Sequence, residues 1–440
     1  MLIACGGSDD TPDGDNNPPV VAPPSEEPVD SRLLYNGIRL PEQWPPVRSS
    51  SSELEKGMSP FYLSDKPSVI NISVGRQLFV DNFLIESTNL KRTFYYPEYY
   101  SGNPILTPEQ DWEKTGTKGA AFAAPFSDGV WYDEKEGKYK MWYMAGGGSY
   151  ATSGAGVTCY AESTDGIHWT KPTLSIVAGT NIVDYNSERD ASVIWLDKQE
   201  SNASKRYKMF LVTRESGKWR YRYKTSPDGK VWRAAAQSEP IADRSTVYKN
   251  PFRNVWVYSM RHNIRVDANK LVRARDYNEN ADPEAGTKKA EALLSAFWFG
   301  PWANEQHHTD YPNIAPAIYN QDATPYESIM LGFFSVWQGP ENDVCASDNV
   351  IKRNQVMVGY SRDGYSWFRE DMNPFHAVNT TTSDAWNQGN LQSVAGAPLI
   401  VGDKLYFYLS GRRLRGTQEI TTTGLATLRR DGFASMKGTG

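Results

Sequence analysis

A short phrase that repeats along the chain limits the folds it can adopt. It reads Ser-x-Asp-Gly-x-x-Trp at residues 163–169, 226–232 and 361–367, and a shortened copy stands at residues 430–435. Asp-Gly is a tight-turn signal, because Gly takes positive φ without steric cost and the Asp side chain can cap its own turn. The Asp residues lie 63, 135 and 68 residues apart. This spacing indicates a unit of about 65 residues, in which one copy lacks the phrase.

The repeat predicts an all-β fold, a five-bladed β-propeller of four-stranded blades. Four marked units and one unmarked unit make five, and each contains β-rich runs separated by turn signals. Residues 281–294 are the only helix-like stretch. We place the blades at about residues 119–172, 189–236, 243–310, 318–372 and 388–436.

The first part of the chain has a different composition from the rest. It is acidic and Pro-rich, and therefore too polar to form a core. The run Leu2–Cys5 resembles the lipobox of bacterial lipoproteins, in which the Cys is acylated. We therefore expect residues 1–60 to be a lipoprotein N-terminus and disordered tether, and residues 61–440 to be the propeller domain. A strand at residues 77–85 would close the ring. The protein would be lipid-anchored in the cell envelope, in the outer membrane or facing the periplasm.

Composition and charge limit the classes of binding partner that this protein can have. The net charge of −5 provides no basic surface for nucleic acid. No run approaches the length of an apolar membrane span, so lipid on Cys5 is the only membrane attachment expected. The sequence predicts no cofactor, leaves a central Ca²⁺ open as an alternative, and leaves the oligomeric state open. Cys159 and Cys345 either pair in an oxidising compartment or stay as two thiols. The adjacent His307 and His308 do not indicate zinc, because neighbours on a strand point to opposite faces.

Site residues are expected at the start of each blade, because first strands line the centre of a propeller. Arg189-Asp190 precedes one apolar strand and Tyr326-Glu327 precedes another, while Glu113 stands ahead of blade 1. Acids at equivalent blade positions converge on one axis. A pair of them, one protonated and one ionised, is what cleavage of a glycosidic bond requires.

The residues expected to be catalytic are therefore Asp190, Glu327 and Glu113, with Glu327 as the proton donor and Asp190 kept ionised by Arg189. Asp322 competes with Glu327 for the blade 4 role. The residues expected to bind substrate are Arg189, Asp243, Arg244, Asp322 and Gln392.

From about Gly75 to Met436 the chain resembles the five-bladed propeller glycoside hydrolases of families 32, 43, 62 and 68. Within that group it is most similar to a subgroup of bacterial lipoproteins. Arg189-Asp190 resembles the Arg-Asp of family 32, where the Asp stabilises the transition state, and Tyr326-Glu327 sits where the group has its acid. Two family 32 features are absent: the Asn-Asp-Pro-Asn-Gly phrase and a Cys-Pro after the Glu. The phrases that carry the likeness are Leu78–Asp81, Gly129–Asp133, Lys140–Tyr143 and Gly402–Tyr408.

The resemblance and the paired acids predict an exported glycoside hydrolase that acts on a poly- or oligosaccharide. One alternative is a phosphorylase similar to the mannoside phosphorylases of family 130. These need one acid and a cluster of basic residues, a role that Arg189, Arg244 and Arg261 would fill. The other alternative is a carbohydrate-binding propeller without catalysis. The resemblance provides no first-blade Asp, so the nucleophile or base stays unassigned.

Overall fold

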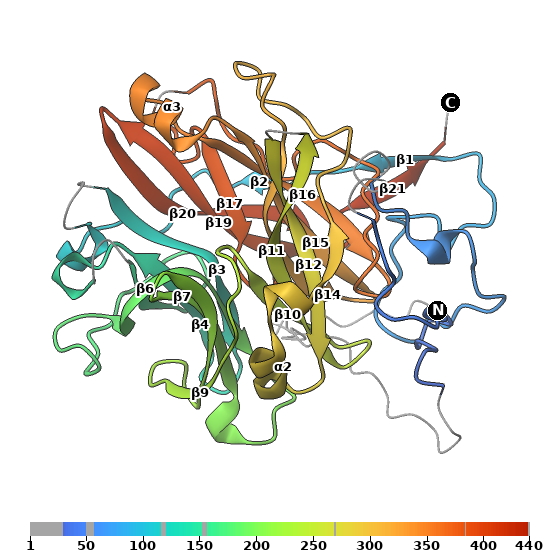
Figure 1. Ribbon diagram of the computed structural model, residues 1–440, viewed down its shortest axis with the longest axis horizontal. Coiled ribbons are helices and arrows are strands. Elements are labelled where there is room, and N and C mark those ends of the chain that lie inside the picture. Colours follow the sequence, from blue (N-terminus) through green and yellow to red (C-terminus); the bar gives the residue numbers. More distant parts are fainter. Residues whose placement is uncertain are drawn as a thin grey trace, which may run out of the picture.

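The computed structural model describes residues 30–49, 57–115, 120–151, 156–267, 270–382 and 384–438. Within this part of the chain, strands dominate and the helices are short (Figure 1). Helix α2 (Pro283–Lys289) lies inside the predicted helix-like stretch, whereas α3 (Asn342–Asp348) was not expected. The prediction of an all-β fold is confirmed. The 3₁₀ turns are η1 (Phe61–Leu63), η2 (Asp111–Glu113), η3 (Gly148–Tyr150), η4 (Ala203–Lys205) and η5 (Ala292–Leu294).

The strands between residues 121 and 429 belong to two sheets, one of four strands within residues 246–299 and one continuous sheet that contains the others. Along the chain these strands fall into five consecutive groups, each paired antiparallel within itself. The groups are β3 (Ala121–Asp133), β4 (Lys138–Ala145) and β5 (Gly156–Ser163); β6 (Ile182–Leu196), β7 (Tyr207–Glu215), β8 (Lys218–Ser226) and β9 (Arg233–Gln237); β10 (Thr246–Asn250), β11 (Val255–Asp267), β12 (Lys270–Asn280) and β13 (Ala296–Phe299); β14 (Ala317–Tyr326), β15 (Ile329–Gly339) and β16 (Arg353–Ser361); and β17 (Asn390–Val394), β18 (Leu399–Val401), β19 (Lys404–Arg415) and β20 (Gln418–Arg429).

The first strands of the five groups contact one another. Strand β3 contacts β6 and β17, β10 contacts β6 and β14, and β14 contacts β17. In addition, β20 of the last group pairs in parallel with β3 of the first, through Ile420 beside Ala121 and Thr421 beside Phe122. Buried polar side chains on these first strands therefore share one central region.

The repeated Ser-x-Asp-Gly turns join neighbouring groups. In each full copy the Ser Oγ accepts a hydrogen bond from the Gly amide, and the Asp carboxylate accepts from the next two amides. The Gly carbonyl accepts a hydrogen bond from an aromatic side chain of the preceding group. For the turn of the first group, this side chain comes from the last group. The pairs are Trp142 with Gly229, Tyr248 with Gly364 and Tyr408 with Gly166, at 2.6, 2.9 and 2.9 Å.

The described N-terminal residues pack against the strands instead of forming a tether. Leu34, Ile38 and Leu40 are buried in one cluster with Tyr62 and Phe83. The segment lies on the side of the molecule that carries β1 and β21 (blue in Figure 1). The prediction of a disordered tether up to residue 60 is therefore wrong for residues 30–49, because a few apolar side chains in a polar stretch are enough to anchor it.

Residues 77–85 form turns and loop, so the predicted ring-closing strand there is wrong. The segment is fixed by an ion pair instead, in which the buried Asp81 carboxylate accepts from the Arg362 guanidinium at 2.8 Å. Nearby, β1 (Lys91–Phe94) pairs with β21 (Ala434–Lys437), and β2 (Glu98–Tyr99) pairs with β20.

Three observations bear on the cysteines and the anchor. Cys159 on β5 and Cys345 on α3 are both unpaired thiols. Cys5 lies outside the described residues, so its lipidation stays a prediction. In the described ranges, none of the helices has the length and apolar character needed to cross a membrane.

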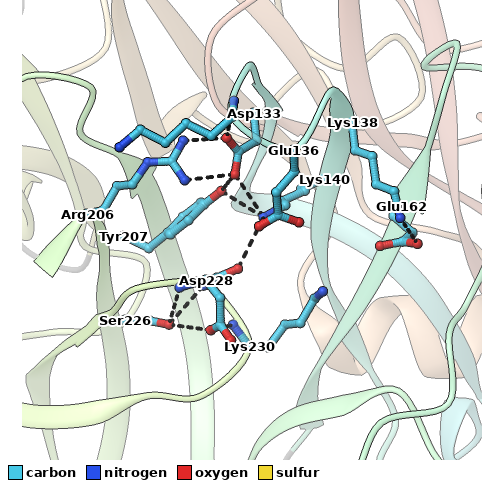
Figure 2. A network of polar contacts seen from close by, with 12 residues as sticks. Asp133, Glu136, Lys138, Lys140, Glu162, Arg206, Tyr207, Ser226, Asp228 and Lys230 are labelled. Carbon is cyan, nitrogen blue, oxygen red and sulfur yellow. Dashed lines mark hydrogen bonds and ion pairs between the residues drawn. The ribbon is translucent and has the colours of Figure 1, made fainter. Parts of the chain in front are cut away.

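A buried polar network joins the first two groups (Figure 2). Asp133 and Lys140 are both fully buried, and the Lys140 ammonium donates to the Asp133 carboxylate at 2.9 Å. Arg206 and Tyr207 from the second group also donate to Asp133. Although burial acts to raise the pKa of Asp133, these hydrogen bonds hold it well below its ordinary value. The carboxylate is therefore charged and serves three donors.

We expect Asp133→Asn to lower the free energy of unfolding by about 3–5 kcal/mol, because it leaves buried cations without a counter-charge. Urea denaturation at neutral pH measures the change. The matched control is Glu136→Gln, which also contacts Lys140 at 2.6 Å but is 37% exposed. Its cost should stay within about 1 kcal/mol. Equal costs for the two variants would contradict the buried role of Asp133.

Candidate active site

Asp190 and Arg244 form an ion pair at the centre of the five first strands. Asp190 lies in the middle of β6, and its carboxylate accepts from the Arg244 guanidinium at 3.0 Å and from the Arg244 amide at 2.6 Å. Arg244 lies just before β10 in a left-handed conformation, with φ of 57°. Arg275 donates to the Arg244 carbonyl at 2.7 Å. The position of the cation is therefore fixed by both its backbone and its side chain.

Two aromatic rings hold the Arg244 guanidinium between them. Its central carbon lies 5.7 Å from the ring centroid of Phe126 on β3 and 5.4 Å from that of Tyr319 on β14. Cations attract aromatic faces at such distances, more strongly where water is excluded. Burial acts to lower the pKa of Arg244, but Asp190 and Tyr319 raise it above its ordinary value. The site therefore presents a permanent cation beside an acid.

Asp322 provides a second acid in a drier setting. It lies on β14, and its carboxyl accepts from the Asn320 amide at 3.1 Å and from the Val394 backbone at 3.3 Å. Asn320 also donates to Ser393 of β17 at 3.0 Å. Burial raises the pKa of Asp322 to about 7, although its hydrogen bonds act to lower it. A large fraction of this carboxyl is therefore protonated near neutral pH.

Arg189 pairs with a third acid, Asp128, and not with the Asp190 carboxylate. The two side chains are almost fully buried, with nitrogen-to-oxygen distances of 2.6 and 3.1 Å. The prediction that Arg189 holds Asp190 ionised is wrong, because successive side chains on a strand point to opposite faces. The Asp190 carboxylate forms its ion pair with Arg244 instead.

The remaining residues predicted to bind substrate lie nearby. The Asp243 carboxylate forms an ion pair with Arg261 of β11. Gln392 is buried on β17, next to the Ser393 that contacts Asn320. The structure thus places Asp190 and Asp322 on the first strands of two groups and Arg244 just before the first strand of a third, with Asp243 and Gln392 next to them.

Glu327 lies elsewhere. It follows the end of β14 and forms a two-residue turn with Ser328, so the prediction that it precedes the first strand of its unit is wrong. Its carboxylate accepts from the Arg76 amide and guanidinium, both at 2.9 Å. It lines a cavity of about 320 Å³ together with Trp131 and Trp195, and Asp190 is not part of that lining. Among the described residues, the cavity that Glu327 lines is therefore not the pocket shared with Asp190 that the sequence predicted.

Glu113 has the contacts of a structural carboxylate. It ends the 3₁₀ turn η2, is fully buried, and accepts from the amides of Glu109 and Gln110 at 2.6 and 2.8 Å. Tyr143 and Lys171 donate to it at 2.7 and 2.9 Å. The Glu113 carboxylate thus accepts from four donors, two from its own loop and two from Tyr143 of β4 and Lys171.

Sequence reasoning missed Asp128, Asn320 and Tyr319. Asp128 is the first-group acid that the sequence did not reveal, because it lies inside an apolar strand and not ahead of it. The polar run Tyr319–Asp322 interrupts β14, which is why the next apolar run was mistaken for the first strand of its unit. Acids within strands, and not only those before strands, are the signal that would have identified Asp128 and supported Asp322 as a site residue.

Comparison with known proteins identifies structural similarity at low sequence identity. No protein-family profile matches the chain, and no curated protein sequence matches it. A solved glycoside hydrolase is similar over 77% of this chain and 92% of its own, with 13% identity and a TM-score of 0.46. An N-acetylgalactosamine deacetylase from F. plautii, in complex with blood group B trisaccharide, is similar over 74% and 96%, with 11% identity and a TM-score of 0.45.

A third similar structure is a fructofuranosidase from Schwanniomyces occidentalis complexed with fructosylnystose. It covers 77% of this chain and 60% of its own length, with 13% identity and a TM-score of 0.43. All three are named as enzymes that act on carbohydrates. Similarity at this level assigns neither an activity nor a substrate to this chain.

Proposed function

We propose that this protein is a glycoside hydrolase whose active site lies at the centre of a five-bladed β-propeller. Two features support the propeller. The first strands of the five groups contact one another. Each of the three full copies of the turn also accepts a hydrogen bond from an aromatic side chain of the group before it, and for the first group that side chain comes from the last group. Propellers use such a central region as their binding site.

The observation that carries the proposal is a pair of acids in unlike surroundings. Asp190 faces the Arg244 cation at 3.0 Å, whereas Asp322 is buried with a pKa of about 7. When the surroundings of two acids favour the protonated form of one and the ionised form of the other, the first can act as an acid and the second as a base or nucleophile. We assign Asp322 as the proton donor to the leaving oxygen, and Asp190 as the ionised group that acts as nucleophile or base.

The competing assignment keeps Glu327 as the proton donor. It requires Glu327 to leave Arg76 and Arg430, which hold its carboxylate at 2.9 and 3.5 Å. Asp322 needs no such movement, because it already lies on a first strand. Asp322 is therefore the acid in this proposal, and Glu113 and Glu327 have structural roles.

A glycan screen tests the proposed activity. Purified protein is incubated with a panel of neutral and acidic oligosaccharides, with and without phosphate, and new reducing ends are measured. We expect wild-type protein to cleave at least one glycan without phosphate, and an Asp190→Asn/Asp322→Asn variant to cleave none. Turnover that requires phosphate and forms a sugar phosphate would replace hydrolysis by phosphorolysis. Binding without turnover of any glycan would favour a non-catalytic propeller.

A further inference from the structure

A cation-rich cavity of about 220 Å³ lies beside the proposed active site. Its lining includes Arg261, Arg273, Tyr319, Trp337 and Lys352, which come from β11, β12, β14, β15 and the residue before β16. This volume is below the roughly 300–1,000 Å³ of pockets for drug-sized ligands, so it suits one sugar residue or a substituent of one.

Positive charges converge on the Tyr319 ring. The Arg273 guanidinium lies 4.7 Å from its centroid, Arg244 lies at 5.4 Å and the Lys352 ammonium lies at 5.8 Å. Burial acts to raise the pKa of Tyr319, but Arg244, Lys352, Arg273 and Arg412 together lower it to about 8. Three side chains that repel one another are thus held around one ring.

Within the part of the chain that the structure describes, two of these cations have acidic partners and two have none. Arg261 pairs with Asp243 and Arg244 pairs with Asp190. Within the described residues, neither Arg273 nor Lys352 forms an ion pair with a protein carboxylate, although Glu341 also lines the cavity. The Arg273 Nη1 atom is buried and has no hydrogen-bond partner in that part of the chain. Arg273 and Lys352 are both half-buried, so part of their hydration is lost. An anion that enters this cavity would supply the missing counter-charge and would itself be stabilised.

We propose that this cavity binds the oxyanion of an acidic sugar, a carboxylate or a sulfate ester, through Arg273 and Lys352. The proposal rests on the proposed function, because it names the class of glycan that the Asp190 and Asp322 site would cleave. Arg244 connects the two regions, since it contacts both Asp190 and the Tyr319 ring. A sugar whose anionic group lies against Arg273 would therefore have its ring close to the acids. Tyr319, while protonated, can donate a further hydrogen bond to the anion.

Calorimetric titration of the intact protein tests this proposal without requiring turnover. The probes are glucuronate, glucose 6-sulfate, glucose and inorganic phosphate, titrated at pH 7. We expect one of the two acidic sugars to bind at least about tenfold more tightly than glucose, and which one does so separates carboxylate from sulfate. Equal affinity for the acidic sugars and glucose would overturn the proposal, and so would binding of phosphate alone.

Two variants locate the effect. Arg273→Met and Lys352→Met should each reduce the preference for the acidic sugar about tenfold or more, because each removes a charge-assisted hydrogen bond. Lys404→Met, which removes an exposed cation on β19, is the matched control and should leave the preference unchanged. Melting temperatures show whether each variant is folded. If one of the two cavity variants does not fold, the other still tests the proposal. An unchanged preference in both folded cavity variants would overturn the proposal.

The outcomes also separate this inference from the proposed activity. If the protein prefers an acidic sugar through Arg273 but cleaves no glycan, the anion-binding site is supported and the hydrolase activity is contradicted. If the protein cleaves neutral glycans at rates that Arg273→Met does not change, the hydrolase activity is supported and the specificity for acidic sugars is contradicted.

Discussion

Asp322→Asn is expected to reduce turnover about 10²–10⁴-fold, which is the range that a positioned general acid contributes. The amide has the same shape as the carboxyl and keeps an oxygen for the Asn320 and Val394 donors, but it cannot give up a proton to the leaving oxygen. Initial rates on the most rapidly cleaved glycan from the screen measure the effect. The matched control is Glu327→Gln, which changes an acid held by Arg76 and should retain near-wild-type rates.

The pH dependence provides a second readout of the same group. If Asp322 is the proton donor, wild-type turnover should fall as pH rises through about 7, because the carboxyl then loses its proton. Glu327→Gln should retain this decline. A loss of several orders of magnitude in Glu327→Gln, with Asp322→Asn unaffected, would instead establish Glu327 as the acid.

Stability should respond to Asp322 in a way that activity alone cannot show. The folded pKa of about 7 lies above the ordinary Asp value of 3.8, so between these values the folded state binds a proton that the unfolded state has lost. Stability of the wild type therefore falls as pH rises through this window. Asp322→Asn removes that loss, so its melting temperature relative to wild type should be higher at pH 8 than at pH 4. A pH-independent difference would show that Asp322 is not buried as a neutral acid.

The sequence predicted the repeat more accurately than the site, for a physical reason. Turns such as Asp165-Gly166 depend on local backbone geometry, so their spacing survives in the sequence and reports the repeating units. The partner of a charged side chain depends on which strands lie next to each other. Arg189 follows this rule, since it reaches across to Asp128 on β3 and not to its neighbour in sequence.

The error over Glu327 has a related cause. A first strand that carries polar site residues loses its apolar pattern, and β14 carries Tyr319 and Asp322. The apolar β15 then looked like the start of the unit, and the acid before it looked like a site residue. The polar residues that form the proposed site therefore also removed the apolar pattern by which its strand could have been recognised in the sequence. The N-terminal segment was misjudged in the opposite direction, because Leu34 and Ile38 are too few to raise its overall hydrophobicity.

Asp190→Asn is the second variant for which we expect a large effect, a loss of about 10²–10³-fold in turnover. The ionised carboxylate stabilises positive charge that develops on the sugar ring, and removing one preorganised electrostatic group from an active site costs about this much. The Asn side chain keeps an oxygen for the Arg244 amide, so the local backbone should hold its position. Initial rates on the same glycan measure the loss.

The substitution also leaves Arg244 without its counter-charge, so loss of stability must be separated from loss of chemistry. Both side chains keep a small exposed edge, 14% for Arg244 and 12% for Asp190, and we expect a cost of about 1–3 kcal/mol in the free energy of unfolding. Asp243→Asn is the matched control, because it uncouples the adjacent acid from Arg261 at a comparable exposure of 23%. It should show a similar change in stability and less than about tenfold change in turnover.

If Asp190→Asn and Asp243→Asn lose activity equally, the ion pairs around the centre are structural, and Asp190 is not the ionised catalytic group. Asp128 on β3 would then be the next candidate for the ionised group. Its pairing with Arg189 at 2.6 Å in a fully buried setting leaves little access for a sugar, so movement of Arg189 would have to precede catalysis. A large loss confined to Asp190→Asn excludes this route, because Asp128 and Arg189 are unchanged in that variant.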